Sequence, residues 1–307
     1  MPLAVLSLRF DPVVEFDGWS LRWQTLAAAA IILLTLVLAA WLAGRAGRGG
    51  PSGRATGLAR LGRDDLLFLA VACVPGAVVG GRVAHVLAYL DYYAGHPGFM
   101  ADPSRGGLSL LGAVLGGTAT AAYVASLLGL PVRRWLDIGA VAVLTGIGLG
   151  KLSLLLGGEG QGRPFAGDWA LAFAGDGPWH SLAPAVPAHP AQVYEALWDL
   201  AGVLLLAVLA AGPVTRRLPA AVRQTGAYAA RREARGEPLA PGSLRFGTLF
   251  VVGLGWFLAG RIVVGFAWRD EAVLAGLNAE QLMAAGTLAG LALSLFGLAT
   301  VRRLRQR

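Results

Sequence analysis

Apolar residues dominate the chain in seven long runs, each separated from the next by a polar segment. A helix needs about 20 consecutive apolar residues to cross the hydrocarbon core of a bilayer. The pattern therefore predicts an all-α, polytopic membrane protein with seven transmembrane helices, forming a single membrane-embedded domain over residues 1–307. The predicted spans are about 23–43, 66–90, 107–130, 137–156, 191–213, 244–268 and 279–300.

The composition agrees with this pattern, because 56% of the 307 residues are hydrophobic, 14% are charged and the mean hydropathy is +0.61. Soluble domains carry about 25% charged residues. The segment before the first run lacks a basic region, so we expect that run to be retained as a span. Cys73, the only cysteine, lies in an apolar run, where we expect a small core residue.

Arginine residues gather in alternate connections and predict the orientation of the chain. The connections after spans one, three and five, together with the C-terminal tail, carry 18 arginines, against 5 on the other side. The positive-inside rule then puts the N-terminus outside and the C-terminus in the cytoplasm. This bias accounts for the net charge of +8, so we expect no nucleic-acid partner. The Arg-rich connection 214–245 indicates a cytoplasmic arm touching anionic lipid.

Three cations fall inside predicted spans: Arg82, Arg261 and Lys151, which is the only lysine of the chain. In the predicted topology all three lie in the outer half of the membrane. A cation at a helix centre costs roughly 2.5–3.5 kcal/mol on insertion scales. Each one alone is compatible with snorkelling to the interface. Three at similar depth on three helices favour a shared site for an anionic ligand, such as a phospholipid headgroup.

The start of the fifth span carries three polar residues on one helix face. Gln192, Glu195 and Asp199 follow at steps of three and four, so their side chains share that face. Polar groups in a span avoid lipid, so we expect them to meet the buried cations. The alternative is a structural ion-pair network without chemistry. The preceding outer loop adds four charged residues, Glu159, Arg163, Asp168 and Asp176, of which the first two can form an ion pair.

Six short motifs lie along the chain in a fixed order. They are FDPV (10–13), LRW (21–23), GGRVAHVLAY (80–89), GGLSLLG (106–112), GEGQG (158–162) and HPAQVYE (189–195). In order, spacing and number of spans, the chain resembles the prolipoprotein diacylglyceryl transferase family over about residues 10–270. The most specific match is HPAQVYE, which resembles the family's HPSQLYE.

The resemblance implies an enzyme of the bacterial plasma (inner) membrane, multi-pass, with its active site toward the outer leaflet. The implied reaction moves diacylglyceryl from phosphatidylglycerol to the lipobox cysteine of a prolipoprotein signal peptide, forming a thioether. The implied partners are these two substrates and the lipid bilayer, with no cofactor and no metal. Cations must hold the phosphate, and a base must help to form the thiolate, because a free thiol has a pKa of about 8.5.

The resemblance and the residue pattern together assign the candidate site. The expected catalytic residues are His189, Glu159 and Arg261, and the candidate bases are His189, Glu159 and His85. The expected phospholipid-binding residues are Arg82, Lys151, Arg163, Gly162, Gln192 and Glu195.

The chain also departs from the family pattern at several positions. Lys151 stands for an arginine, Leu154 and Gly157 for asparagines, Leu111 for a histidine, Gln24 for a tyrosine and Gly265 for a glutamate. Lysine keeps the positive charge but lacks the bidentate fork of arginine. These departures leave open a phospholipid-binding relative with a different or lost transferase activity. A small transporter or structural subunit ranks lower, because the chain has no internal repeat.

Overall fold

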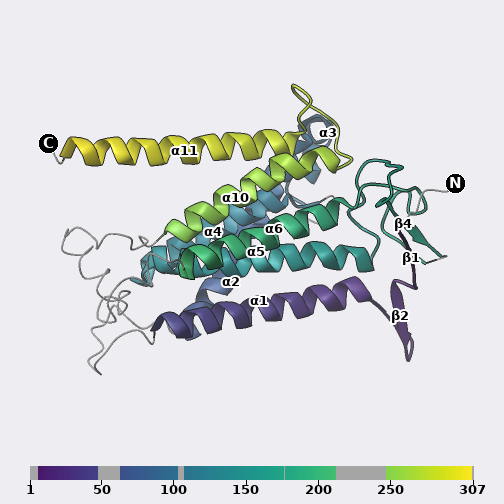
Figure 1. Cartoon of the computed structure of the whole chain (residues 1–307), viewed down its shortest axis with the longest axis horizontal. Coiled ribbons are helices and arrows are strands. Elements are labelled where there is room, and N and C mark those ends of the chain that lie inside the picture. The colour runs from purple at the N-terminus through teal and green to yellow at the C-terminus, as the bar shows by residue number, and fades with distance from the viewer. Residues whose placement is uncertain (1–5, 48–62, 103–106, 176, 212–246, 306–307) are drawn as a thin grey trace. The chain divides into compact units, whose positions relative to one another are not determined.

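The computed structural model describes residues 6–47, 63–102, 107–175, 177–211 and 247–305 (Figure 1). Among these residues, seven helices are long and apolar enough to cross a membrane, which confirms a mostly helical, polytopic membrane protein. They are α1 (Trp23–Gly47), α2 (Arg63–Ala88), α4 (Leu110–Leu127), α5 (Val132–Ser153), α6 (Ala191–Ala211), α10 (Thr248–Val264) and α11 (Ala279–Arg305). The predicted arm at 214–245 lies outside the described residues.

Short elements connect or extend the spans. The helix α3 (Leu90–Gly95) and the 3₁₀ turn η1 (Pro97–Phe99) follow α2, and the 3₁₀ turns η2 (Leu154–Leu156) and η3 (Gly265–Ala267) extend α5 and α10. The helix α5 begins at Val132, earlier than the predicted residue 137. The hydropathy pattern places the start too late because the first turn of α5 contains the two charged residues Arg133 and Arg134.

The chain divides into two compact units. The first unit comprises Met1–Ile32, Thr145–Ala201 and Gly255–Arg307. The second comprises Leu33–Leu144 and Gly202–Leu254. The boundary falls inside α1, α5, α6 and α10. The expectation of a single functional domain over 1–307 stays a prediction.

Glycine residues bring α2 and α4 of the second unit into close contact. A Cβ atom added to Gly112 would collide with the carbonyl oxygen of Gly80, and one on Gly116 would collide with that of Gly76. Small residues four apart let two membrane helices approach until their backbones touch. The hydroxyl of Ser109 precedes α4 and accepts a hydrogen bond from the Gly112 N–H at 3.4 Å, which caps the helix.

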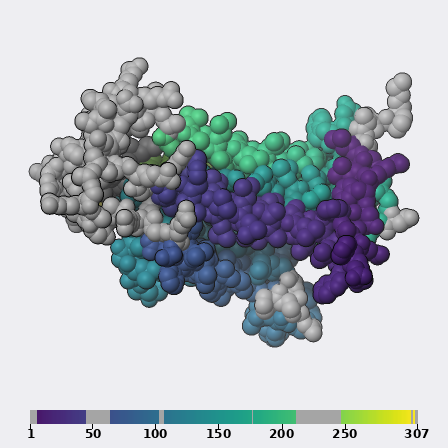
Figure 2. All heavy atoms as spheres, turned by 90° about the horizontal axis from the view of Figure 1, so that it is seen from below, coloured from purple at the N-terminus to yellow at the C-terminus, as the bar shows by residue number. Residues whose placement is uncertain are grey.

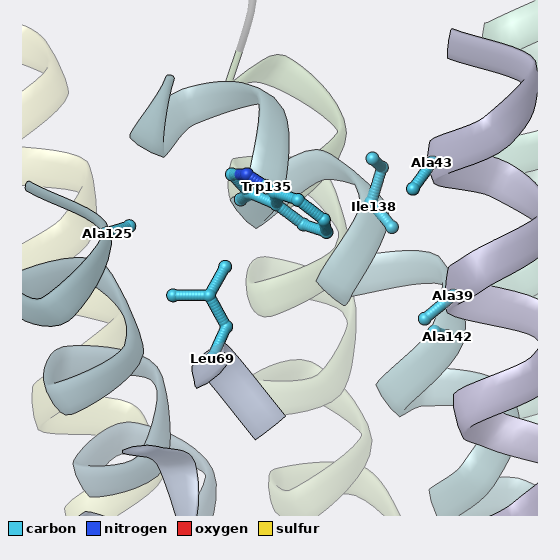
Figure 3. Packing of buried hydrophobic residues seen from close by; sticks show 7 residues of the cluster. All are labelled: Ala39, Ala43, Leu69, Ala125, Trp135, Ile138 and Ala142. Atoms are coloured by element: carbon cyan, nitrogen blue, oxygen red, sulfur yellow. The ribbon is translucent and has the colours of Figure 1, made fainter. Parts of the chain in front are cut away.

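A second apolar contact in this unit joins four helices. It consists of Ala39, Ala43, Leu69, Ala125, Trp135, Ile138 and Ala142 (Figure 3). In Figure 3 the indole ring of Trp135 from α5 lies above Leu69 of α2, and Ile138 points toward Ala43 of α1. Alanine at most of these positions lets the helix backbones come close, so one indole fills the remaining space.

Asp137 of α5 has a structural reason to lie within a span. Its two carboxylate oxygens accept hydrogen bonds from the N–H groups of Gly247 and Phe250, at 2.8 and 2.9 Å. The first N–H groups of a helix have no partner inside that helix, and they carry a partial positive charge. Asp137 thus caps α10 and is a packing residue of the second unit.

Among the residues that the structure describes, the first unit contains four short strands that the hydropathy pattern did not predict. The strand β1 (Leu6–Arg9) pairs in parallel with β4 (Leu171–Ala174), and β2 (Val13–Phe16) forms a hairpin with β3 (Trp19–Arg22). The hairpin turn is Asp17–Gly18, with φ values of 45° and 80°, as a type I′ turn requires. Figure 2 shows β1, β2 and β3 as dark purple atoms continuous with the start of α1.

Two tryptophans fasten α6 to α10 in the first unit. The Trp198 indole N–H donates to the Trp256 carbonyl at 2.9 Å, and the Trp256 indole N–H donates to the Trp198 carbonyl at 2.8 Å. Their rings stack with centroids 4.9 Å apart. A Cβ atom on Gly260 would meet the Trp198 ring, so glycine there makes room for it. This pairing fixes the two helices whose next turns carry Glu195 and Arg261.

We expect Gly116→Ala to lower the melting temperature of the detergent-solubilised protein by several degrees, because the new methyl group collides with α2. Gly286→Ala in α11 is the matched control, since a Cβ there meets nothing within 4 Å. In an open helical position alanine is favoured over glycine by about 1 kcal/mol. Equal melting temperatures for the two variants would contradict the tight α2–α4 contact.

Candidate functional site

The carboxylate of Glu195, on the second turn of α6, lies at the centre of the site. One of its oxygens contacts the Lys151 ammonium and the other contacts the Arg261 guanidinium. The indole N–H of Trp268 donates to the second oxygen at 3.3 Å. Glu195 is 4% exposed, and the two cationic side chains are 15% and 13% exposed. Three helices, α5, α6 and α10, therefore meet at one buried anion.

Lys151 lies on the last turn of α5 and has two kinds of partner. Besides the Glu195 carboxylate, its Nζ lies 4.8 Å from the centroid of the Trp268 ring. An ammonium over an indole face gains a cation–π attraction of about 2 kcal/mol when both are desolvated. The indole of Trp268 thus contacts both the cation and its counterion.

Arg261 has a second carboxylate partner, Glu280, on the first turn of α11. The sequence pattern did not predict Glu280 as a partner of Arg261. Gln281 reaches back to α10, where its amide donates to the Ile262 carbonyl at 2.8 Å. A Cβ atom on Gly265 would overlap the Gln281 side chain, so the glycine leaves the space that Gln281 fills.

Two residues cap the start of α11, and their spacing can be recognised in the sequence. Asn278 and Gln281 exchange hydrogen bonds between side chain and backbone N–H, both at 2.8 Å. This is the reciprocal pattern of a capping box, and it places Glu280 in the first turn. The sequence N-x-x-Q before an apolar run predicts the helix start, but not that Glu280 faces Arg261.

Gln192 is fully buried one turn before Glu195, on the same face of α6. Neither its amide nitrogen nor its amide oxygen has a hydrogen-bond partner among the described residues. Gly160, at φ +78°, approaches it so closely that an added Cβ would lie 3.1 Å from the Gln192 Cβ. Buried amides are normally hydrogen-bonded, so this one is suited to a polar ligand.

Glu159 lies in the turn after η2, and each of its carboxylate oxygens contacts another side chain. Gln24 donates to one oxygen at 2.9 Å, and the Nδ1 atom of His180 lies 2.5 Å from the other. The Gln24 side chain occupies the space next to Gly157 where a Cβ atom would stand. The two departures from the family pattern at 24 and 157 are therefore in contact with each other.

Gly162 and Arg163 tie this turn to the segment after η3. A Cβ atom on Gly162 would collide with the Ala267 carbonyl, and its N–H donates to the His189 carbonyl at 2.8 Å. The Arg163 side chain donates to the carbonyls of Trp268 and Asp270, at 2.9 and 3.3 Å. Arg163 is exposed, and its predicted role in phospholipid binding stays a prediction.

His189, just before α6, is half-buried and stacks on Phe165 with ring centroids 4.0 Å apart. Its Nδ1 lies 3.2 Å from the Tyr194 hydroxyl, which also accepts a hydrogen bond from the indole of Trp169 at 2.7 Å. His189 therefore belongs to an aromatic group, and its predicted catalytic role stays a prediction.

Arg82 belongs to the second unit, as does the candidate base His85, whereas the other predicted site residues belong to the first. Its guanidinium donates to the carbonyls of Met100 and Gly107, at 2.9 and 3.3 Å, and to that of Phe99. It also lies 5.0 Å from the centroid of the Tyr93 ring. These bonds fold the segment after α3 around a buried cation, and a role in phosphate binding stays a prediction.

Most of the chain is similar to known proteins. The family model for prolipoprotein diacylglyceryl transferase matches residues 12–232. The phosphatidylglycerol–prolipoprotein diacylglyceryl transferase of Trichormus variabilis is 29% identical over 97% of this chain and 92% of its own length. The enzymes of the same name from Beijerinckia indica and Methylibium petroleiphilum are 32% and 34% identical, over 68% and 66% of this chain, each with 72% of its own length covered.

We expect Glu195→Gln to destabilise the protein by about 3–5 kcal/mol, the usual cost of removing one partner of a buried ion pair. The variant keeps the shape of the side chain but leaves Lys151 without a carboxylate. Thermal unfolding in detergent measures the effect. Glu15→Gln on the exposed strand β2 is the control and should unfold like the wild type. A wild-type melting temperature for Glu195→Gln would contradict the shared ion pair.

Proposed function

The chain belongs to the prolipoprotein diacylglyceryl transferase family, and we propose that it transfers diacylglyceryl from phosphatidylglycerol to the lipobox cysteine of prolipoproteins. The observation that carries this proposal is the pair of cations, Lys151 and Arg261, on the Glu195 carboxylate within apolar segments. The phosphate diester of a membrane lipid can bind both cations and replace part of their contact with the Glu195 carboxylate. Such a site favours lipid phosphate over neutral lipid.

The reaction needs charge stabilisation and a thiolate. The cysteine sulfur attacks the glyceryl carbon, the carbon–oxygen bond to phosphate breaks, and glycerol phosphate leaves with the bonding electrons. Negative charge grows on the leaving phosphate, so cations placed beforehand lower the barrier. Arg261 offers a guanidinium with several donors, whereas Lys151 acts as a point charge. We assign Arg261 to the leaving phosphate and Lys151 to holding it before the reaction.

The other site residues divide into binding and catalytic roles. Gln192, whose buried amide has no hydrogen-bond partner in the described part of the chain, suits the hydroxyl groups of the headgroup glycerol. Gly162 keeps the turn close to α6 and Glu195 keeps the two cations together. Glu159 is assigned to the proton-transfer step, and His189 remains an alternative base. Arg82 and Arg163 are assigned to the phospholipid on charge alone.

We place the N-terminus outside, the C-terminus in the cytoplasm and the site toward the outer leaflet of the bacterial inner membrane. An odd number of spans leaves the two ends on opposite sides, and the arginine bias of the connections sets the direction. Lys151 and Arg261 lie near the ends of spans that run outward in this topology.

One observation favours a second candidate, a phospholipid-binding relative with a different or lost transferase activity. Leu111 takes the place of a family histidine, and its side chain is 1% exposed in α4. A buried leucine there offers no proton acceptor. A transfer assay separates the two candidates, because both predict binding of phosphatidylglycerol but only the first predicts a modified peptide.

The assay combines purified protein, phosphatidylglycerol and a lipobox peptide, and detects the diacylglyceryl-modified cysteine by mass spectrometry. We expect product from the wild type, and a loss of about 10²–10³-fold for Arg261→Ala and Lys151→Ala, the range for removing one charge-stabilising group. Arg9→Ala, on the exposed side of β1, is the control. Folded wild-type protein that binds the lipid without forming product would favour the second candidate.

Lys151→Arg separates two roles for the lysine. If Lys151 only holds phosphate, the variant keeps or gains activity, because arginine has the same charge and a better fork. If Lys151 serves as a neutral amine base, activity disappears, because arginine does not lose its proton. We expect the first result, measured as initial rates in the same assay.

A further inference from the structure

Arg22, His180 and Glu159 form a line of three bonded side chains in the first unit. The Nδ1 atom of His180 lies 2.5 Å from a Glu159 oxygen, and its Nε2 atom lies 2.6 Å from Nη1 of Arg22. Arg22 ends β3, Glu159 follows η2, and His180 belongs to the long loop before α6. The sequence pattern singled out Glu159 but gave His180 no role.

The partners of His180 fix which nitrogen carries its proton. A guanidinium has only donors, so the Nε2 atom that faces Arg22 must be the acceptor. The proton of the neutral ring is then on Nδ1, where it is donated to the Glu159 carboxylate. A carboxylate on one nitrogen and a lone pair on the other is the arrangement of a histidine base.

The surroundings hold this line in place from several sides. The backbone N–H of His180 donates to the Gly157 carbonyl at 3.0 Å. The side-chain amide of Gln24 donates to the second oxygen of Glu159 at 2.9 Å. The neighbouring Trp179 is packed between two phenylalanine rings at 5.0 and 4.9 Å. The side chains of His180 and Glu159 are still 47% and 37% exposed, so a peptide can reach them.

The line is built on the same turn as the cation site. The Glu159 N–H donates to the Leu154 carbonyl at 3.0 Å, which folds the turn back on η2, directly after the helix that carries Lys151. The next residue, Gly160, packs on the buried Gln192. The turn that carries Glu159 therefore follows the helix of Lys151 and contacts the buried Gln192, which links this line of side chains to the candidate lipid site.

The other histidines of the first and second units have different partners. His189 contacts a phenol and a phenylalanine ring. His85 accepts from the Gly107 N–H at 3.2 Å, and His96 bonds to the Tyr92 carbonyl at 3.0 Å. In the part of the chain that the structure describes, His180 is the histidine that pairs with a carboxylate.

From this geometry we infer that His180 is the general base that activates the acceptor thiol, with Glu159 as its positioning residue and Arg22 as the cation beside the thiolate. The inference rests on the proposed transferase function. Arg22 moves from Nε2 toward the incoming sulfur, and Nε2 takes the proton of the S–H bond. The thiolate forms the sulfur–carbon bond while the carbon–oxygen bond to phosphate breaks. The imidazolium then releases its proton to water.

The test is His180→Gln in the transfer assay, run from pH 6 to pH 10 with a lipobox peptide and phosphatidylglycerol. Near neutral pH we expect kcat to fall at least about 10²-fold with KM nearly unchanged, because general-base catalysis contributes factors of that order. Above about pH 8.5 the free thiol ionises by itself. The gap to the wild type should therefore close at alkaline pH. Glu159→Gln should give a smaller loss of the same form.

His96→Gln, in the second unit and outside the site, is the matched control and should keep wild-type rates. Wild-type rates for His180→Gln would overturn the inference. So would a loss that is equal at every pH, because that result indicates a role in loop packing alone. Absence of product from the wild-type protein is a different result, since it overturns the proposed function on which the inference rests. Melting temperatures identify any variant that fails to fold, and Glu159→Gln then provides the decisive profile.

Discussion

The arrangement of the first unit depends on one buried carboxylate, that of Glu195, which balances the charges of two cations. A lysine and an arginine inside apolar segments are tolerated only if their charge is compensated nearby. Glu195 compensates both, and it does so from a third helix. Because the three side chains start on α5, α6 and α10, the ion pairs also set how these helices meet. Glu280 extends the same logic to α11 through Arg261.

Around this centre the protein uses neutral contacts to hold charged groups. The reciprocal bonds of Trp198 and Trp256 fix α6 against α10. The Trp268 indole contacts both Lys151 and Glu195. A site held in this way keeps its geometry when a phosphate replaces part of the carboxylate's interaction. This is the preorganisation that electrostatic catalysis needs.

The sequence predicts the features that follow from local periodicity. Seven apolar runs gave the seven helices, and the steps of three and four placed Gln192 and Glu195 on one buried face. The pairing of Arg261 with Glu280 was missed, because it joins residues 19 apart through a turn whose path no periodicity encodes. His180 was missed for the same reason, since an irregular loop brings it to Glu159. The four-residue strands are too short to stand out from a polar loop.

The contact between Gln24 and Gly157 has a consequence for how such a site can change over generations. The Gln24 amide stands where a side chain at 157 would begin, so a larger residue at 157 requires the end of the flexible Gln24 side chain to move. That movement takes the amide nitrogen of Gln24 away from the Glu159 oxygen to which it now donates at 2.9 Å. A substitution at 157 therefore acts on the hydrogen bonding of Glu159 through Gln24, so that residues 24 and 157 are expected to change together.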